Sequence, residues 1–480
     1  MLLAVVAALA LAGSARTAHA EEESAVDVYG GCLVAQKAGD LLIIVDESAS
    51  LDTNDPDNAR IASAKYLLTQ LNAFADRAKV TLDVSVAGFS HEYSEVQDWT
   101  KLDDAGLQQT LGTVDSFADR PYGFETDYWM ALEGARRSLA EHNPEGDRCQ
   151  ALVWITDGGL DVDFRRDGQQ RRDYGETKPY LPDTKLADED AAQQAEAEAE
   201  RQICRNGGLA DQLRSSKVTV FGVGLRGAEK PDYTLMKSIA LGGDAGGQHC
   251  GKITRPPGDF TEAANIDQLL FEFDKFATPN QKKRTTESGV CQGEPCPEER
   301  HTFVLDDSVQ SVHVLGSSDV DDAEVYLVTP AGKEVKLTRK GIGETTGADT
   351  GAVSIDYSWQ SERTLVIDLA AEAGTQGWAG PWSVVFVDPT GKSPDGKSRT
   401  SIAISGDVFP AWPDVDSTRL RAGEPATVQL GLVNADGDPI DPAKLLGTVA
   451  MDVTLETADG RTVQVADGLG KTGIAGPVTL

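Results

Sequence analysis

The sequence predicts an α/β domain built on a doubly wound, Rossmann-like sheet and followed by smaller all-β modules. Two patterns lead to this prediction. Between residues 38 and 278, short apolar runs alternate with amphipathic helical patterns, which is typical of βαβ units with a parallel sheet. From residue 301 onward the runs alternate apolar with polar side chains, and turn residues such as the Pro-Ala-Gly at 330–332 separate them, which is typical of an antiparallel sandwich.

The central strands of the α/β domain are expected at 41–45, 151–155 and 218–221. The first is a continuous apolar run and the others are largely apolar, because a parallel strand that helices cover on both faces has no side facing water. A weaker edge strand is expected near 249–253. The remaining elements of this domain are a strand at 80–89, an antiparallel strand at 93–99, and helices near 58–78, 126–139 and 264–277.

Composition marks the boundaries of the other segments. Residues 4–12 are an apolar run too short to span a bilayer, and the small-residue pattern Ala18-His19-Ala20 follows it, so residues 1–20 are expected to be a signal peptide. The other predicted segments are the α/β domain at 38–278 with an acidic insertion at 161–200, a polar linker at 279–300, a β-sandwich at 301–406, and an Ig-like β module at 408–480 that is short for a complete sandwich.

The charge of the chain limits the partners that it can bind. Its 480 residues carry 44 basic and 77 acidic side chains, a formal net charge of −33. This charge repels nucleic acids and anionic lipid surfaces, and it favours cations or basic partners. After the signal peptide no apolar run reaches the length of a transmembrane helix. We therefore expect a secreted or cell-surface protein that neither binds nucleic acid nor spans a membrane.

The cysteines predict disulfides, because their number is even and a signal peptide precedes them. Cys32 and Cys149 precede the first two buried strands, so a bridge between them fits the amino edge of the sheet if those strands are neighbours. All six cysteines are expected to be oxidised, and six cysteines allow fifteen connectivities. The closely spaced Cys291 and Cys296 are the easiest pair to predict, and if Cys32 bridges Cys149, then Cys204 and Cys250 would pair near the third strand and the edge of the sheet.

Polar side chains follow the predicted strands at their carboxyl ends. The first buried strand runs directly into Asp46-Glu47-Ser48-Ala49-Ser50, and Asp157 ends the second. Thr126 lies just before a predicted helix. Doubly wound sheets bind ligands at this edge, and if the strands are neighbours the three loops meet at one point. The first motif alone is weak, since such residues often only cap helices, but its order and strand context strengthen it.

This arrangement resembles the metal-ion-dependent adhesion site of von Willebrand factor A (vWA) and integrin inserted domains. Asp46, Ser48 and Ser50 match the first loop of that motif, Thr126 the second and Asp157 the third. The resemblance implies a vWA domain of the secreted bacterial type that holds Mg²⁺, with Mn²⁺ or Ca²⁺ as alternatives. It further implies that the hydroxyls bind the ion directly and the carboxylates mostly through water, which leaves one position open for a carboxylate of a partner protein.

The predicted function is therefore that of an extracellular, metal-dependent protein-binding or adhesion module and not of an enzyme. The alternative is a structural or envelope-assembly component in which the metal only stabilises the vWA fold. A metal-dependent hydrolase would need a general base beside the ion, for which Asp157 and His91 are the candidates.

Two sequence patterns of nucleotide-binding enzymes also occur, and neither has the context that such a site needs. The glycines at 222–227 fit a dinucleotide pattern but follow a late strand of the sheet, and no acidic residue ends the next strand. Residues 391–398 match a phosphate-binding loop formally, but an alternating strand follows where a helix is required. We interpret this second segment as a hairpin loop.

Overall fold

The structure is a computed structural model that describes residues 25–120, 123–226, 231–263, 265–277, 283–350, 353–371, 375–406, 408–412, 427–434, 436–456, 462–475 and 477–479. The predicted signal peptide, residues 1–20, lies outside the described residues. The chain divides into two compact units, of which Glu23–Gly406 is one and Asp407–Leu480 belongs to the other. None of the helices among the described residues is long and apolar enough to cross a membrane.

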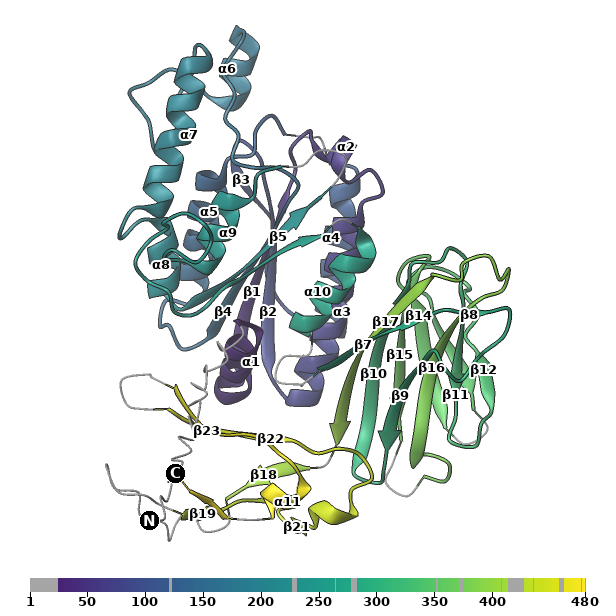
Figure 1. The fold of residues 1–480 in the computed structure, drawn as a ribbon. Coiled ribbons are helices and arrows are strands. Elements are labelled where there is room, and N and C mark those ends of the chain that lie inside the picture. The colour runs from purple at the N-terminus through teal and green to yellow at the C-terminus, as the bar shows by residue number, and fades with distance from the viewer. Residues whose placement is uncertain are drawn as a thin grey trace, which may run out of the picture. The chain divides into compact units, whose positions relative to one another are not determined.

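A six-stranded sheet forms the centre of the α/β domain (Figure 1). The strand order is β3-β2-β1-β4-β5-β6, and all neighbours are parallel except β2 and β3. The three central strands that the sequence predicts are confirmed, and β1 lies between β2 and β4. The strands are β1 (Ala38–Asp46), β2 (Thr81–Phe89), β3 (Tyr93–Lys101), β4 (Cys149–Thr156), β5 (Val218–Leu225) and β6 (Asp259–Ala263).

The edge strand differs from the prediction, because β6 lies at 259–263 and not at 249–253. Within the predicted segment, Cys250 makes only an isolated bridge to Gly243. The sequence of β6 is mostly polar and only its last residue is fully buried, as expected for a strand at the rim of a sheet. Hydrophobic periodicity therefore gave no signal for this strand.

Helices cover both faces of the sheet, and the side chains of β1 explain why residues 41–45 are continuously apolar. Leu41, Ile43 and Val45 pack into one hydrophobic cluster with α1, α3, α4 and α10, whereas Leu42 and Ile44 pack into a second with α5, α8 and α9. The helices are α1 (Ala25–Gln36), α2 (Leu51–Asn54), α3 (Ala59–Ala78), α4 (Asp104–Asp115), η1 (Ser116–Ala118), α5 (Tyr128–His142), α6 (Gly168–Tyr174), α7 (Glu189–Cys204), α8 (Leu209–Ser215), α9 (Thr234–Leu241) and α10 (Ile266–Ala277).

The acidic insertion supplies α6 and α7, which project beyond the sheet at one end of the domain (Figure 1). It has a small core of its own, in which Tyr180 and Leu186 pack with Ala195 and Ala199 of α7. Trp129 at the start of α5 packs against this core, so the insertion is attached to the domain by apolar as well as polar contacts.

The structure contains three disulfides, Cys32–Cys149, Cys204–Cys250 and Cys291–Cys296, which are the pairs that the sequence favours. The first ties α1 to the amino end of β4, and the second ties α7 to the loop before β6.

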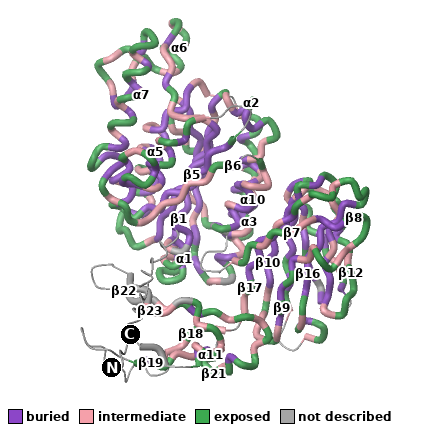
Figure 2. Tube along the Cα trace, viewed as in Figure 1, coloured by how far each residue is buried: buried purple, intermediate pink, exposed green. Residues whose placement is uncertain are grey.

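A β-sandwich follows the α/β domain within the same compact unit (Figure 1). One sheet has the order β13-β14-β15-β10-β17-β7 and the other β12-β11-β16-β8, with β9 paired to β16. Trp378, Trp382 and Phe386 are buried between them, where Figure 2 shows buried strands. The strands are β7 (Lys283–Gly289), β8 (Cys291–Gln292), β9 (Arg300–Leu305), β10 (Val309–Ser318), β11 (Glu324–Val328), β12 (Glu334–Lys336), β13 (Thr345–Asp349), β14 (Ser354–Trp359), β15 (Thr364–Ala370), β16 (Gly380–Asp388) and β17 (Lys397–Gly406).

The structure of two segments of this sandwich differs from the sequence prediction. Residues 283–292, expected in a linker, form β7 and β8, and β7 pairs antiparallel with β17 along its whole length. An edge strand is held by backbone hydrogen bonds and keeps polar side chains, so its sequence resembles a linker. The loop before β17, interpreted as a hairpin loop, instead connects strands of different sheets, β16 and β17.

The second unit, Asp407–Leu480, contains short strands around a small apolar cluster of Leu432, Met451 and Ile474. The described elements form a three-stranded and two two-stranded sheets. They are β18 (Phe409–Ala411), β19 (Thr427–Gln429), β20 (Gly431–Val433), β21 (Pro439–Ile440), η2 (Pro442–Lys444), β22 (Met451–Glu456), β23 (Thr462–Leu469), α11 (Lys471–Ile474) and β24 (Pro477–Thr479).

Candidate metal site at the carboxyl edge of the sheet

Two buried aspartates lie side by side where β1 and β4 end. Asp46 is the last residue of β1, and Asp157 follows the last residue of β4 directly. The two strands are parallel neighbours in the register Val45 with Ile155, so their carboxyl ends coincide. Both aspartates are completely buried.

The hydroxyls of the loop after β1 point to Asp157. Ser50 Oγ donates to Asp157 Oδ1 over 3.0 Å, Ser48 Oγ to the same oxygen over 3.3 Å, and the two hydroxyls lie 2.9 Å apart. Asn54 Nδ2 donates to the other carboxylate oxygen over 3.1 Å. Asp46 accepts hydrogen bonds from the backbone N–H of Ser48 and from a threonine hydroxyl at the end of β4.

Thr126 completes the group from a third loop. It is buried, and its hydroxyl and that of Ser50 face the same space above Gly158, because a Cβ built at Gly158 would lie 3.5 Å from the first oxygen and 3.9 Å from the second. The structure therefore brings together all five residues that the sequence singled out, Asp46, Ser48, Ser50, Thr126 and Asp157.

The electrostatics of this group favour a cation. Burial raises the pKa of the Asp46 carboxyl, and the adjacent charge of Asp157 raises it further; burial also raises the pKa of Asp157. Among the described residues neither carboxylate has an ion pair, and their hydrogen-bond donors are neutral. Two adjacent buried carboxylates with three hydroxyl oxygens are a donor set that fits a hard divalent ion such as Mg²⁺.

Comparison with known proteins identifies the family of the segment that carries these residues. Residues 41–159 match the von Willebrand factor type A domain. The chain contains a vWA domain. The matching segment begins in the first strand of the vWA sheet and ends two residues after Asp157, so it includes all five residues of the site. No curated protein matches the chain.

Several solved structures are similar to this chain at low sequence identity. A von Willebrand factor type A protein from Catenulispora acidiphila is 12% identical, with a TM-score of 0.31, over 83% of this chain and 63% of that one. The PilB minor pilin from Streptococcus sanguinis is 15% identical, with a TM-score of 0.35, over 50% of this chain and 60% of that one. The pilus adhesin SpaC from Lactobacillus rhamnosus GG is 13% identical, with a TM-score of 0.33, over 92% and 51%. This chain thus spans about half to two thirds of the length of these proteins.

Glu47, which the motif leaves free to vary, has a structural role in this vWA domain. Its carboxylate accepts hydrogen bonds from the guanidinium of Arg120, and the side chain lies against Gly88 of β2. Burial raises the pKa of Glu47, while Arg120 opposes this shift. Glu47 therefore links the motif loop to the loop that precedes Thr126.

His91, one of the two candidate bases for a hydrolase, makes its described contacts with residues other than the five of the site. Its ring packs edge-on against Tyr174 of the insertion, at 4.8 Å between centroids, and its Nδ1 lies 3.2 Å from Ser90 Oγ. Both oxygens of the other candidate, Asp157, are engaged by Ser48, Ser50 and Asn54.

A second acidic group, which sequence reasoning missed, lies at the amino edge of the same sheet. Ligand atoms of Asp40, Asp83 and His142 all lie within 4.8 Å of one another. Arg148 forms ion pairs with both aspartates, at 2.5 and 2.8 Å. Its guanidinium offsets part of their charge, so the group differs from the five-residue site, whose carboxylates have no such partner among the described residues. The sequence signals were an aspartate near the start of each of two largely apolar strands, Asp40 in β1 and Asp83 in β2.

Proposed function

We propose that this chain is an exported binding protein whose vWA domain holds a divalent ion on Asp46, Ser48, Ser50, Thr126 and Asp157 and uses it to bind a carboxylate of a partner protein. Mg²⁺ is the proposed ion, with Mn²⁺ and Ca²⁺ as alternatives. The three disulfides support export, because such bonds persist in oxidising compartments, so we place the protein outside the cell or on its surface.

The observation that carries the proposal is the convergence of two uncompensated carboxylates with three hydroxyls. Hydroxyl ligands are neutral, so an ion bound by Ser48, Ser50 and Thr126 would keep most of its positive charge. Such an ion supplies an electrophilic centre that attracts a Glu or Asp side chain. Charge complementarity thus supports an acidic protein segment as the partner, although the chain itself carries a net charge of −33.

We further propose that the site performs no catalysis. A hydrolytic site needs a base that can take a proton from water near the ion. Asp157 already accepts three hydrogen bonds, and the described contacts of the His91 ring are with Ser90, Glu92 and Tyr174. This arrangement supports binding rather than proton transfer.

Calorimetry with Mg²⁺ and Mn²⁺ tests the metal site. Wild type should bind either ion, and Thr126→Ala and Asp157→Ala should bind much more weakly. Thr69→Ala is a matched control, because Thr69 lies on the exposed side of α3 and bonds only within its own helix. Absence of any divalent-ion binding by wild type would refute the proposal.

Partner binding separates the proposed function from its alternative. If the ion recruits a partner, an acidic protein recovered from extracellular material should bind purified wild type with measurable affinity, and EDTA and Thr126→Ala should each abolish that binding. If the purified pair binds equally well in EDTA while Mg²⁺ still raises thermal stability, the metal only stabilises the fold, as in a structural or assembly component.

A further inference from the structure

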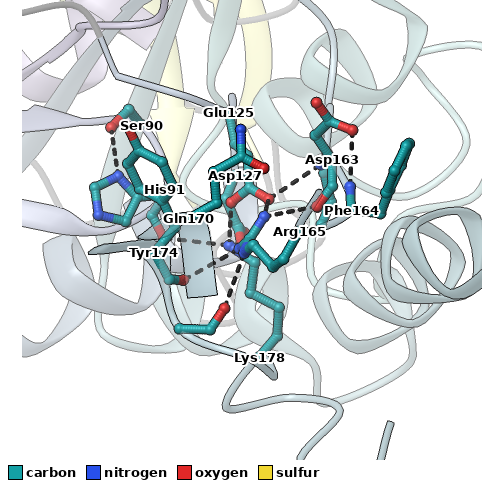
Figure 3. Close-up of polar contacts among 12 residues, drawn as sticks. Ser90, His91, Glu125, Asp127, Asp163, Phe164, Arg165, Gln170, Tyr174 and Lys178 are labelled. Atoms are coloured by element: carbon teal, nitrogen blue, oxygen red, sulfur yellow. Dashed lines mark hydrogen bonds and ion pairs between the residues drawn. The ribbon is translucent and has the colours of Figure 1, made fainter. Parts of the chain in front are cut away.

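Thr126 lies between two buried carboxylates, and the insertion neutralises both. On one side is Glu125, whose Oε1 accepts from Arg165 over 2.6 Å and whose Oε2 accepts from Lys178 over 2.5 Å. All three side chains are at most 3% exposed. Figure 3 shows Arg165 and Lys178 reaching from the insertion to this carboxylate.

The same lysine also bonds to the residue on the other side of Thr126. Lys178 Nζ lies 2.8 Å from Asp127 Oδ2, and the hydroxyl of Tyr180 donates to that oxygen over 2.9 Å. The other oxygen, Oδ1, accepts from the backbone N–H of Met130 and so caps α5. Lys178 therefore bridges the residues before and after Thr126 and connects them to the first turn of the helix that follows.

The backbone of Thr126 is fixed by the insertion as well. Thr126 N donates to Asp161 O over 3.0 Å, and Asp161 N donates to Thr126 O over 3.1 Å. The cations are themselves held in place, since Lys178 also contacts the carbonyl of His91, and Arg165 donates to the carbonyl of Gly175 over 2.8 Å. The loop that presents the Thr126 hydroxyl is thus contacted by the insertion on both flanks and along its backbone, and Asp127 N also donates to Ser90 O.

The pairing of buried charges favours one conformation of the loop that carries Thr126. Two buried carboxylates, Glu125 and Asp127, face two buried cations, Arg165 and Lys178. Any displacement that separates them leaves a buried charge without a partner, which is strongly unfavourable. An ion network of this kind stabilises one geometry, and that geometry places the Thr126 hydroxyl above Gly158 with the hydroxyl of Ser50.

We propose that Lys178 is a positioning residue of the metal site, and that the insertion holds the Thr126 hydroxyl where it binds the ion. This inference rests on the proposed function. A network that only stabilised the fold would, when broken, lower thermal stability without changing the metal affinity of the molecules that remain folded. Positioning predicts a loss of affinity in the folded protein, as for other groups that orient metal ligands.

The test is Lys178→Met in the full chain, with Mg²⁺ and Mn²⁺ calorimetry and thermal unfolding measured together. We expect the dissociation constant to rise by about 10-fold to 100-fold. Lys283→Met is the matched control, because Lys283 has a side chain that is only 11% exposed and lies 2.8 Å from buried Asp274, but it belongs to the β-sandwich. It should lower thermal stability and leave the dissociation constant unchanged. Lys185→Met, in an exposed ion pair of the insertion, should change neither.

A readout without metal separates this inference from the proposed function. In metal-free protein, hydrogen exchange of the Thr126 amide, which bonds to Asp161, should accelerate in Lys178→Met and not in Lys185→Met. If wild type binds the ion and Lys178→Met binds it equally well, the inference is wrong and the proposed function stands. If wild type binds no ion, both are wrong.

Tyr180→Phe covers the case in which Lys178→Met does not fold. It removes one hydrogen bond to Asp127 while keeping the ring and all four charges. Its dissociation constant for Mg²⁺ should rise a few-fold, and an unchanged value would overturn the inference.

Discussion

His313 Nε2 of β10 lies 3.2 Å from Asp274 Oδ1 of α10, so a buried ion pair joins the β-sandwich to the last helix of the vWA domain. His313 Nδ1 lies 2.7 Å from Asp368, and the Tyr66 hydroxyl and Lys283 also contact the Asp274 carboxylate. Protonated His313 and Lys283 together balance the two carboxylates. The two domains therefore share a polar contact whose strength depends on the protonation of one histidine.

The first prediction is that stability falls as pH rises through about 9. Burial lowers the pKa of His313, but Asp368 and Asp274 outweigh burial and raise it to about 9. A folded-state pKa above the unfolded value of about 6.5 gives a contribution that is complete below pH 6.5 and lost as pH rises through 9. It amounts to at most about 3 kcal/mol, and His313→Gln should remove it.

Calorimetric midpoints between pH 6 and pH 9.5 test this prediction. His301→Gln is the control, because His301 is also a buried histidine of the sandwich, but burial lowers its pKa to about 4. Because the pKa of His301 is lowered, this histidine contributes stability above pH 6.5 that is lost as pH falls through about 4. His301→Gln should therefore change the pH dependence of stability only in the acidic range. If wild type and His313→Gln lose stability equally over the alkaline range, the ion pair contributes nothing.

The second prediction is that Asp46→Asn stabilises the metal-free vWA domain and reduces its response to Mg²⁺. Asparagine keeps the hydrogen bond from Ser48 N and can donate to the threonine hydroxyl at the end of β4, while the repulsion with Asp157 disappears. In wild type a hundredfold excess of Mg²⁺ over its dissociation constant should add about 2.7 kcal/mol. Thermal unfolding of both proteins in EDTA and in Mg²⁺ measures this. A metal-free variant that is less stable than wild type would contradict the proposed repulsion.

The third prediction concerns the disulfides, which should leave no free thiol in the exported protein. Cys32–Cys149 closes a loop with a sequence separation of 117, and Cys291–Cys296 one of 5. In the chain-entropy model these loops correspond to about 5 and about 2 kcal/mol. Replacing the first pair by alanine should thus lower the free energy of unfolding more than replacing the last, as denaturant titration would show. Thiol labelling of the denatured, unreduced protein checks oxidation, and several labelled cysteines would contradict it.

The parts of the structure that the sequence predicted are those with strong local signals. Strands β1, β4 and β5 are largely apolar and buried, and Asp46 and Asp157 lie at the carboxyl ends of two of them, so strand context pointed to the five residues of the candidate site. Edge strands β6 and β7 were not predicted, because backbone hydrogen bonds hold an edge strand in the sheet even when its side chains are polar. The ion pairs of Lys178 with Glu125 and Asp127 were not predicted, because these partners lie about fifty residues away in the sequence. A single lysine in an acidic segment forms no sequence pattern that would indicate such a contact.

The last prediction concerns where the β-sandwich begins. A polar linker at 279–300, as the sequence predicts, would let a fragment that starts at residue 301 fold alone, but β7 pairs with β17 and β8 with β16. A fragment of residues 283–406 should therefore unfold cooperatively and at a higher denaturant concentration than one of 301–406, in which β17 pairs only with β10 and becomes an edge of its sheet.

The hydrophobic cluster that the sandwich shares with the vWA domain limits the stability of both fragments. Leu315 and Val366 of the sandwich are buried in one hydrophobic cluster with Phe271 of α10, so each fragment exposes apolar side chains that the vWA domain covers. At about 25 cal/mol per Å² of newly exposed apolar surface, both fragments should be less stable than the sandwich within the full chain. Replacing Leu315 by Gln should raise the solubility of each fragment and lower the stability of the full chain. Equal midpoints for the two fragments would show that β7 adds nothing to the sandwich, and the domain would then begin at β9.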